Sequence, residues 1–467
     1  MQFARRGAAR LAPALFGLLL ALALPGLAAA NELHVPVDYY KLPNGLRVVL
    51  SQDHTAPTVC VGVYYRIGFR IEPKDRTGFA HLFEHMMFQG SQNLGKMEFV
   101  KLIQANGGIL NGSTRFDFTN YFEVVPSNKL ETILWAEADR MSGLAVTEAN
   151  LKNQQGVVGN EVKVNVLNRP YGSFPWIDLP MAANTNWYNS HNFYGDLSDI
   201  ESAKLDEVKQ FFNTYYAPNN AVLVIVGDFE TADAKKMVEK YFAGIKPAEL
   251  PPQPDLTEPR QEKEKTVTRQ DTLAPRPALA IGYHMPERST PEYYAMGLLN
   301  QILVEGDDSL LHQELVQKRG LTDSVEGGIN LIGNMFNYKG PMLFSAFVIY
   351  DPATKPETVI EAMDSVIDPL LSKPVDPKTL DRARVKLRSS LYDTMGQSGG
   401  FGLMDLLASF ALFDDNPEKI NDLVAQFDKV TPELVLKTAQ EYLRPTNRTI
   451  VEIEPAPKKA DAPAKNQ

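Results

Sequence analysis

The pattern of hydrophobic and polar positions predicts a strand-rich segment between residues 38 and 67. Asn44-Gly45 is a dipeptide typical of tight hairpin turns, and apolar residues follow it at every second position. The alternating positions are Leu46, Val48 and Leu50, and then Val59, Val61 and Val63. A further alternating stretch, rich in Thr, Phe and Tyr, runs from Ile109 to Val125 and is predicted as strand.

Apolar residues at helical spacing predict several helices in the first half of the chain. Residues 165 to 195 are aromatic and show no regular period, so they are predicted to be irregular. The predicted helices are a segment after Gly78, Lys96 to Ala105, a segment containing Leu130, Leu134, Ala138 and Met141, Glu148 to Val164, Leu205 to Tyr215 and Ala232 to Phe242, with a strand at Ala221 to Val226.

A charged, proline-rich segment at residues 246 to 262 is predicted as a linker that divides the chain into domains 31–245 and 263–454. The tail 455–467 is predicted to be disordered. No sequence repeat is visible, but strands and helices follow in similar order in both halves, which predicts two similar α+β domains. The second half is predicted to hold strands at Ala278 to Tyr283, Ser324 to Leu331, Met342 to Ile349 and Thr449 to Glu454, helices at Tyr293 to Leu303 and Leu310 to Lys318, and three further helical stretches.

Residues 1 to 30 have the pattern of a signal peptide. Three arginines precede an apolar stretch from Leu11 to Leu27, and Ala28-Ala29-Ala30 offers small residues for cleavage after Ala30. The apolar stretch is short and interrupted by proline and glycine, which favours removal over a retained membrane anchor. The sequence therefore predicts an exported protein, periplasmic or secreted, without stable membrane insertion.

Charge and cysteine content narrow the range of partners. The net charge is −10, and it becomes −13 without the three arginines of the leader. An acidic surface argues against nucleic acid and anionic membranes as partners. Cys60 is the only cysteine in the sequence, so no internal disulfide forms.

Two histidines and a glutamate form the pattern H-x-x-E-H, which is typical of one class of zinc peptidases. His81 and His85 stand four residues apart and therefore share one face of a helix, with Glu84 beside them. Imidazole nitrogens are good zinc ligands, and a neighbouring carboxylate can take a proton from an activated water.

A catalytic zinc site needs a third protein ligand. From residue type alone, Glu161, His191 and several other acidic residues stay open for this role. Glu161 lies on a predicted helix beside Val157-Val158, where a carboxylate is costly to bury unless it is paired or bound to metal. His191 lies in a loop and is predicted to pack or to form hydrogen bonds instead.

Seven runs along the chain match one known family. They are Leu42-Pro-Asn-Gly-Leu46, Gly78 to Gly90, Gly107-Gly-Ile-Leu-Asn111, Tyr216-Ala-Pro-Asn-Asn220, Val226-Gly-Asp228, Lys318-Arg-Gly-Leu321 and Leu443-Arg-Pro-Thr-Asn447. Through them the chain resembles the pitrilysin-type zinc metallopeptidases (inverzincins, peptidase family M16), in the short two-domain subtype similar to mitochondrial processing peptidase subunits. The resemblance covers about residues 36 to 454. It implies two domains, each a mostly antiparallel sheet packed with helices, that form half of a clam-shell chamber.

The resemblance also implies a role for each residue of the metal site. The family's third ligand is a glutamate about 75 residues after the second histidine, and Glu161 stands 76 positions after His85. This implies one zinc ion per chain, held by His81, His85 and Glu161, with Glu84 as the general base in peptide cleavage. Several family members have a second glutamate seven positions before the ligand, where this chain has Gln154.

The stretch from Asn111 to Asp117 matches the family's edge strand, on which a peptide substrate pairs through its backbone. The substrate-binding residues implied are Asn111, Gly112, Ser113 and Thr114. For Asn111, an ordinary turn residue at the end of a strand stays open as the alternative.

Family members that act alone carry an arginine and a tyrosine seven residues apart, which donate hydrogen bonds to the substrate carbonyl. The matching positions here are Val316 and Asp323, which provide neither donor. Arg319 and Tyr338 lie nearby in the sequence and stay open as substitutes. The resemblance therefore implies a partner, a homologous M16-like subunit that carries the Arg/Tyr pair.

The sequence thus predicts an exported zinc-dependent endopeptidase that cleaves peptides or unfolded segments, as the metal-bearing subunit of a heterodimer. The alternative is a non-catalytic peptide-binding or scaffold subunit of an M16-like complex. The complete set His81, Glu84, His85 and Glu161 favours the first function, while the missing Arg/Tyr pair favours the second.

Overall fold

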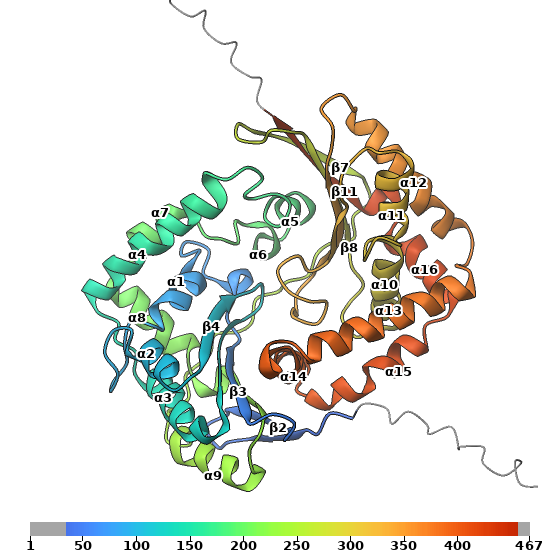
Figure 1. The fold of residues 1–467 in the computed structure, drawn as a ribbon. Coiled ribbons are helices and arrows are strands. Elements are labelled where there is room, and N and C mark those ends of the chain that lie inside the picture. The colour runs from blue at the N-terminus through green and yellow to red at the C-terminus, as the bar shows by residue number, and fades with distance from the viewer. Residues whose placement is uncertain (1–33, 456–467) are drawn as a thin grey trace, which may run out of the picture. The chain divides into compact units, whose positions relative to one another are not determined.

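A computed structural model of the chain describes residues 34 to 455. The predicted signal peptide and all but the first residue of the predicted tail lie outside the described residues. These residues contain two β-sheets, and each is packed with helices (Figure 1).

The first half of the chain contains a six-stranded sheet. Its strands are β1 (Asp38–Lys41), β2 (Arg47–Gln52), β3 (Thr58–Tyr65), β4 (Ile109–Thr114), β5 (Thr119–Pro126) and β6 (Ala221–Gly227). They lie side by side in the order β1-β2-β6-β3-β5-β4, so β4 forms one edge. The predicted hairpin at Asn44-Gly45 is confirmed, and Gly45 takes a φ of +88°, which glycine adopts without steric cost.

The predicted strand from Ile109 to Val125 is wrong in one respect. Residues 115–118 turn the chain back on itself, and the stretch forms the antiparallel pair β4 and β5. The amide of Arg115 donates to the carbonyl of Phe118 at 2.8 Å, which closes this turn. Alternation of apolar and polar residues continues through the turn, so periodicity does not reveal the break.

Helices accompany these strands in the first half of the chain. They are α1 (Phe79–Met86), α2 (Glu98–Ala105), α3 (Leu130–Ser142), α4 (Glu148–Val162), α5 (Asp178–Ala183), α6 (Trp187–Ser190), α7 (Leu197–Ser202), α8 (Leu205–Tyr215) and α9 (Thr231–Phe242). One turn of π-helix, Lys163–Leu167, continues α4. The segment predicted to be irregular holds α5 and α6, which are too short to show a helical period.

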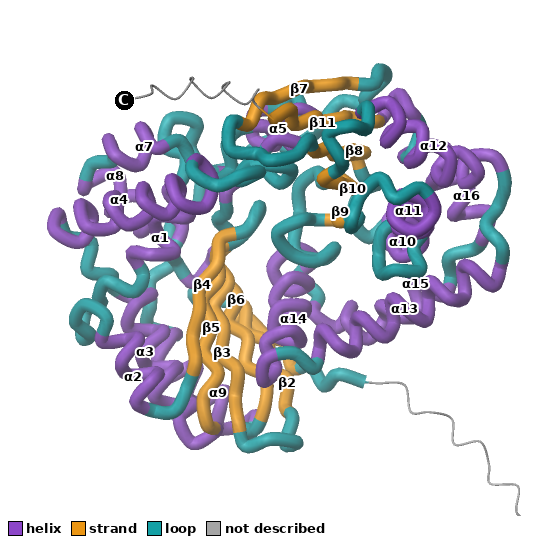
Figure 2. Tube along the Cα trace, turned by 45° about the horizontal axis from the view of Figure 1, so that its top comes forward, coloured by secondary structure: helices purple, strands orange, loops and turns teal. Residues whose placement is uncertain are grey.

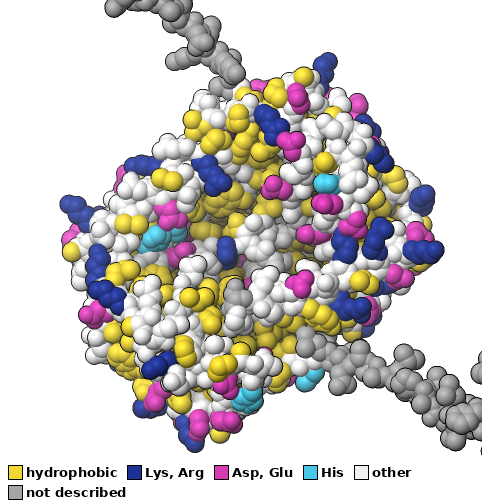
Figure 3. Space-filling model, viewed as in Figure 1, with side chains coloured by type: hydrophobic (Ala, Val, Ile, Leu, Met, Phe, Trp, Pro, Cys, Tyr) yellow, Lys and Arg dark blue, Asp and Glu magenta, His cyan; other side chains and the backbone are white. Residues whose placement is uncertain are grey.

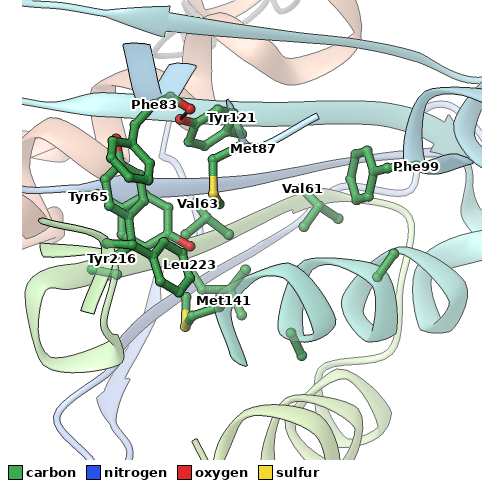
Figure 4. Packing of buried hydrophobic residues seen from close by; sticks show 14 of the residues in the cluster. Val61, Val63, Tyr65, Phe83, Met87, Phe99, Tyr121, Met141, Tyr216 and Leu223 are labelled. Carbon is green, nitrogen blue, oxygen red and sulfur yellow. Dashed lines mark hydrogen bonds between the residues drawn. The ribbon is translucent and has the colours of Figure 1, made fainter. Parts of the chain in front are cut away.

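The core of the first half fixes the buried face of α1. Phe83 packs on Phe211 of α8 and on Tyr216, with ring centroids 5.2 Å and 4.9 Å apart. Figure 4 shows Phe83 and Tyr216 near Tyr121, whose hydroxyl donates to the carbonyl of Phe83 at 3.0 Å. Buried aromatic rings of this kind contribute strongly to core stability. The apolar side chains of the helix with the H-x-x-E-H pattern therefore fix it to the core of the first half.

The second half contains a five-stranded sheet. Its strands are β7 (Lys265–Asp271), β8 (Ala278–His284), β9 (Glu326–Ile329), β10 (Leu343–Ile349) and β11 (Arg448–Pro455). They lie in the order β7-β11-β8-β10-β9. Strand β7 was not predicted, because this edge strand is mostly polar and pairs with β11, which lies far away in the sequence.

The two sheets share one topology once β1 is set aside. In each sheet the first strand pairs in parallel with the last, which pairs antiparallel with the second. The second then pairs with the fourth, and the fourth with the third at the edge. All pairs except β2 with β6 and β7 with β11 are antiparallel. The structure therefore confirms a two-domain α+β fold with mostly antiparallel sheets.

The helices of the second half are α10 (Pro291–Leu303), α11 (Leu310–His312), α12 (Pro356–Ser372), α13 (Pro377–Met395), α14 (Phe401–Asp414), α15 (Leu423–Asp428) and α16 (Pro432–Tyr442). A turn of π-helix, Gln313–Lys318, follows α11. The prediction of three helical stretches after Ile349 is wrong, because five helices, α12 to α16, follow it. Proline at the first turn of α12, α13 and α16 marks starts that the sequence analysis did not use.

Helix α14 joins the second half to the first sheet. Most of its side chains are apolar and buried. The helix packs on β3 and β6, and Figure 2 shows it beside these strands. Gly62 of β3 lies so close to Met404 that a Cβ at this glycine would stand 2.5 Å from the methionine sulfur.

Within residues 34 to 455, no helix combines the length and apolar character that crossing a bilayer requires.

Candidate active site

Helix α1 begins at a tight approach between two loops. Gly78 precedes the helix with a φ of +83°, and a side chain there would press against Ile200. The carboxylate of Glu72 accepts hydrogen bonds from the backbone amides of Gly78, at 2.8 Å, and Ala80. Since Gly78 has no side chain to cap the helix, Glu72 satisfies two of its free amides from outside.

Glu72 is fully buried, and its burial raises the pKa of its carboxyl to about 8. The two amide hydrogen bonds oppose this rise because they stabilise the charged form. Asp199 of α7 lies close by and accepts from the amide and hydroxyl of Thr77. Two carboxyl groups therefore organise the backbone that leads into the H-x-x-E-H helix.

Helix α4 brings Glu161 to the two histidines. Thr147 caps its start by accepting from the amide of Asn150, and Glu161 lies in its last turn. The Glu161 carboxylate oxygens lie 3.4 Å from Nε2 of His81 and 3.1 Å from Nε2 of His85. These histidines, through their hydrogen bonds, hold the pKa of Glu161 well below its usual range.

The geometry of these three side chains fits a zinc ion. Ligand atoms at the corners of a tetrahedron with bonds of about 2.1 Å stand about 3.4 Å apart. His81, His85 and Glu161 offer one ligand atom each, all within 4.8 Å of one another. Two imidazoles and one carboxylate are also a donor set found in catalytic zinc sites. Among residues 34 to 455, this is the one group of three or more such side chains that could hold a metal.

Glu84 lies beside this cluster and is held by β4. The hydroxyl of Thr114, the last residue of this edge strand, donates to Oε2 of Glu84 at 2.7 Å. The carboxylate is half-buried and stays outside the His81, His85 and Glu161 group. Glu84 therefore adjoins the cluster in the sequence and on α1 without being one of its candidate ligands.

Tyr194 is a part of the site that the sequence analysis missed. Its hydroxyl donates to Oε1 of Glu161 at 2.7 Å, and its ring lies 4.8 Å from the ring of His81. Neither a motif nor a spacing in the sequence connects a tyrosine in this loop to the metal cluster, so Tyr194 was not predicted.

The predicted substrate residues lie where the resemblance implies, along the free edge of β4. The Asn111 side-chain oxygen accepts from the amide of Gly112 at 2.9 Å, and the Ser113 hydroxyl donates to Asn120 at 2.6 Å. Thr114 connects this edge to Glu84. Their role in substrate binding stays a prediction.

Two other residues lie away from the cluster. Both ring nitrogens of His191 lie against backbone carbonyls, those of Trp187 at 3.0 Å and Phe69 at 2.9 Å, which confirms hydrogen bonding for this residue. The amide of Gln154 donates to Asn153 at 2.8 Å. The polar contact to Glu161 comes instead from Tyr194.

The positions expected to hold the Arg/Tyr pair carry no such donors. Asp323 is exposed and pairs with Arg276 at 3.1 Å. The possible substitutes are also occupied or enclosed, because Arg319 pairs with Glu314 at 2.8 Å and Tyr338 is buried in the second half.

A cavity of about 850 Å³ adjoins the cluster. Thr114 and Tyr194, which hold Glu84 and Glu161, line one side, and residues 325–336 line the other. Figure 3 shows histidine and acidic side chains together over α1 and α4, with hydrophobic side chains gathered toward the middle of the same face. A cavity of this size accommodates several residues of an extended peptide.

Two matching α+β domains and an H-x-x-E-H helix beside a later glutamate define the inverzincin class of proteins. The model described as "Insulinase (Peptidase family M16)" matches residues 47–170, and the one described as "Peptidase M16 inactive domain" matches residues 202–387. The chain belongs to peptidase family M16.

Named relatives and solved structures agree with this assignment. The zinc protease PqqE of Helicobacter pylori is 26% identical over 423 residues, which cover 89% of this chain and 92% of the relative. A probable mitochondrial-processing peptidase subunit beta of Arabidopsis thaliana is 22% identical over 428 residues, which cover 89% and 77%. The crystal structure of a protease from Helicobacter pylori superposes with a TM-score of 0.83 at 25% identity, covering 90% of this chain and all of that one.

Proposed function

We propose that this chain is a zinc-dependent endopeptidase that cleaves peptides or unfolded segments. The observation that carries the proposal is the convergence of His81, His85 and Glu161 at distances suited to one zinc ion, with Glu84 beside them. The names of relatives such as PqqE support zinc as the metal. The scaffold alternative has less support, because none of these four side chains is missing or turned away.

Each residue has a task in this mechanism. His81, His85 and Glu161 would hold zinc, which supplies Lewis acidity toward a peptide carbonyl and makes water a better nucleophile. Glu84 takes the proton from the attacking water and passes it to the leaving amine. Thr114 orients Glu84 through its hydroxyl, and it ends the strand on which the peptide backbone pairs.

Removal and return of the metal test this function directly. A chelator should abolish cleavage of an unfolded protein by the active preparation, and one equivalent of zinc should restore it. The same protein treated with chelator and then with magnesium is the control, since oxygen-preferring Mg²⁺ matches a two-imidazole site poorly. Cleavage that persists in the metal-free protein would show that these residues do not form the catalytic centre.

We also propose that turnover needs a homologous subunit. Val316 and Asp323 supply no donor for the substrate carbonyl. Arg319 is paired with Glu314, and Tyr338 is buried in the second half. An aspartate would repel the developing negative charge. The complementary chain would carry the Arg/Tyr pair and lack an intact H-x-x-E-H.

Mixing purified chains measures this requirement. The chain alone should cleave an unfolded protein slowly, and addition of a family chain with the Arg/Tyr pair should raise the rate severalfold or more. A complementary chain with its arginine and tyrosine replaced by alanine and phenylalanine is the matched control. Full turnover by the chain alone would defeat the partner hypothesis while leaving the zinc mechanism intact.

Export to the periplasm is the third part of the proposal. It rests on the basic, apolar and small-residue order of the first 30 residues. One structural neighbour with the same fold, at 16% identity and a TM-score of 0.71, is described as the periplasmic protease PqqL from Escherichia coli. The match covers 91% of this chain and 48% of that one.

A further inference from the structure

We infer that Tyr194 is the positioning residue of the metal site, because it contacts two of the three proposed ligands at once. Its hydroxyl donates to Glu161 at 2.7 Å, and its ring lies against the ring of His81 at 4.8 Å with a 30° angle between the planes. The inference rests on the proposed zinc site and adds the side chain that orients it.

His81 has a ring nitrogen without a hydrogen-bond partner among residues 34 to 455. A histidine that binds metal through one nitrogen usually donates the other N–H to a fixed acceptor, which sets the ring orientation. Nδ1 of His81 is buried, and no hydrogen-bond partner for it lies among residues 34 to 455. His81 is 3% exposed, so bulk solvent does not reach this nitrogen. Contact with the face of Tyr194 therefore takes over the orientation of His81.

The glutamate side depends on a hydrogen bond. Glu161 lies in the last turn of α4 and is followed by a π-helical turn, so backbone geometry alone fixes its side chain weakly. The hydroxyl of Tyr194 donates to Oε1, the same oxygen that lies nearest His81. Gln154, two helical turns earlier in α4, donates its side-chain amide to Asn153 instead.

Tyr194 is itself held rigidly, as a positioning residue must be. Its amide donates to the side chain of Asn192 at 3.2 Å, and Trp176 packs edge-on against its ring at 5.4 Å. The following residue, Gly195, has a φ of +87°, and a side chain there would stand 2.4 Å from Cα of Gly78. This approach fastens the Tyr194 loop to the start of the H-x-x-E-H helix.

Zinc affinity of the purified full chain tests the inference without reference to turnover. Competition with a chromophoric chelator would compare the parent protein with Tyr194→Phe, Tyr194→Leu and the control Tyr188→Phe. Tyr194→Phe keeps the ring and removes the hydroxyl, and we expect about tenfold weaker binding, while Tyr194→Leu removes both and should cost up to about 100-fold. Tyr188 lies in the preceding helix and packs on Trp187, so its variant should bind zinc like the parent.

The outcomes separate the inference from the proposed function. A parent protein that binds no zinc would overturn the proposed function itself. A parent that binds zinc together with a Tyr194→Phe variant of unchanged affinity would overturn the inference, whatever Tyr194→Leu does. Melting temperatures of the zinc-free proteins complete the test, because weaker binding by an equally stable Tyr194→Phe variant assigns the effect to the site and not to unfolding.

Discussion

Replacement of Glu84 by glutamine should abolish most turnover and leave the metal in place. The amide has the size of the carboxylate, and its oxygen can still accept the hydrogen bond from Thr114, which measures 2.7 Å in the parent protein. It cannot take a proton from water, and loss of general base catalysis costs about 10²- to 10⁴-fold. Initial cleavage rates and zinc content per chain, measured on the same preparation, check both parts of this result.

The control for this substitution is Glu148→Gln. Glu148 is exposed in the first turn of α4, so its replacement makes the same chemical change away from the cluster. It should keep both rate and zinc. A Glu84→Gln protein that cleaves at the parent rate would exclude Glu84 as the base, and one that has lost its zinc would mean that Glu84 helps to hold the metal.

Local patterns in the sequence were sufficient for the helix of the metal site. His81 and His85 share a face because the helical period puts residues four apart together, and the structure places them so. The hairpin at Asn44-Gly45 and the helix Leu205 to Tyr215 were predicted for the same reason, since turn dipeptides and amphipathic periods act over a few residues.

Contacts between distant segments were not predictable in this way. Residue type and burial made Glu161 one of several candidate third ligands, and only the family resemblance singled it out. Tyr194, 33 residues from Glu161, was not predicted. Glu72 also went unnoticed, because a carboxyl that caps a neighbouring helix leaves no periodic signal. Strand β7 depends on pairing with β11, which lies about 184 positions later. Its mostly polar sequence does not predict a strand.

The two sheets share one topology, yet among residues 34 to 455 only the first half holds a side-chain cluster that could bind a metal. In both halves a helix follows the second strand of the shared arrangement, and these helices are α1 and α10. Helix α10 lacks histidine and is buried along most of its length. Helix α1 is also mostly buried, but it carries His81, Glu84 and His85, and the last two stay partly exposed. The fold allows a site at the equivalent helix of either half, and the side chains of α1 place it in the first half.

Replacement of Arg140 by methionine should strongly destabilise the first half of the protein. Arg140 is 1% exposed, donates to Glu137 at 2.8 Å and to Glu123 at 3.2 Å, and lies over the ring of Phe99 at 4.1 Å. Methionine keeps the apolar contacts and leaves two buried carboxyl groups without their cation. Breaking a buried ion pair from one side costs about 3–5 kcal/mol, which a shift of the urea unfolding midpoint would measure. The control Lys240→Met removes a cation from an exposed pair with Glu131 and should leave the midpoint unchanged.

The opposite substitution in this cluster, Glu123→Gln, should be tolerated and should change the pH dependence of stability. Burial, followed by the charge of Glu137, raises the pKa of Glu123 well above its usual range. Above about pH 4.3 the unfolded chain releases this proton while the folded protein retains it, so the folded state binds more protons and loses stability as pH rises. Glutamine has no proton to release, and the variant should therefore lose less stability than the parent between pH 5 and 8. Glu72 adds a fall of the same sign in both proteins, up to its folded pKa of about 8, and cancels in the comparison. If Glu123→Gln destabilised the protein as much as Arg140→Met, Glu123 would have to be ionised in the folded state, and the arginine would be neutralising two charges instead of one.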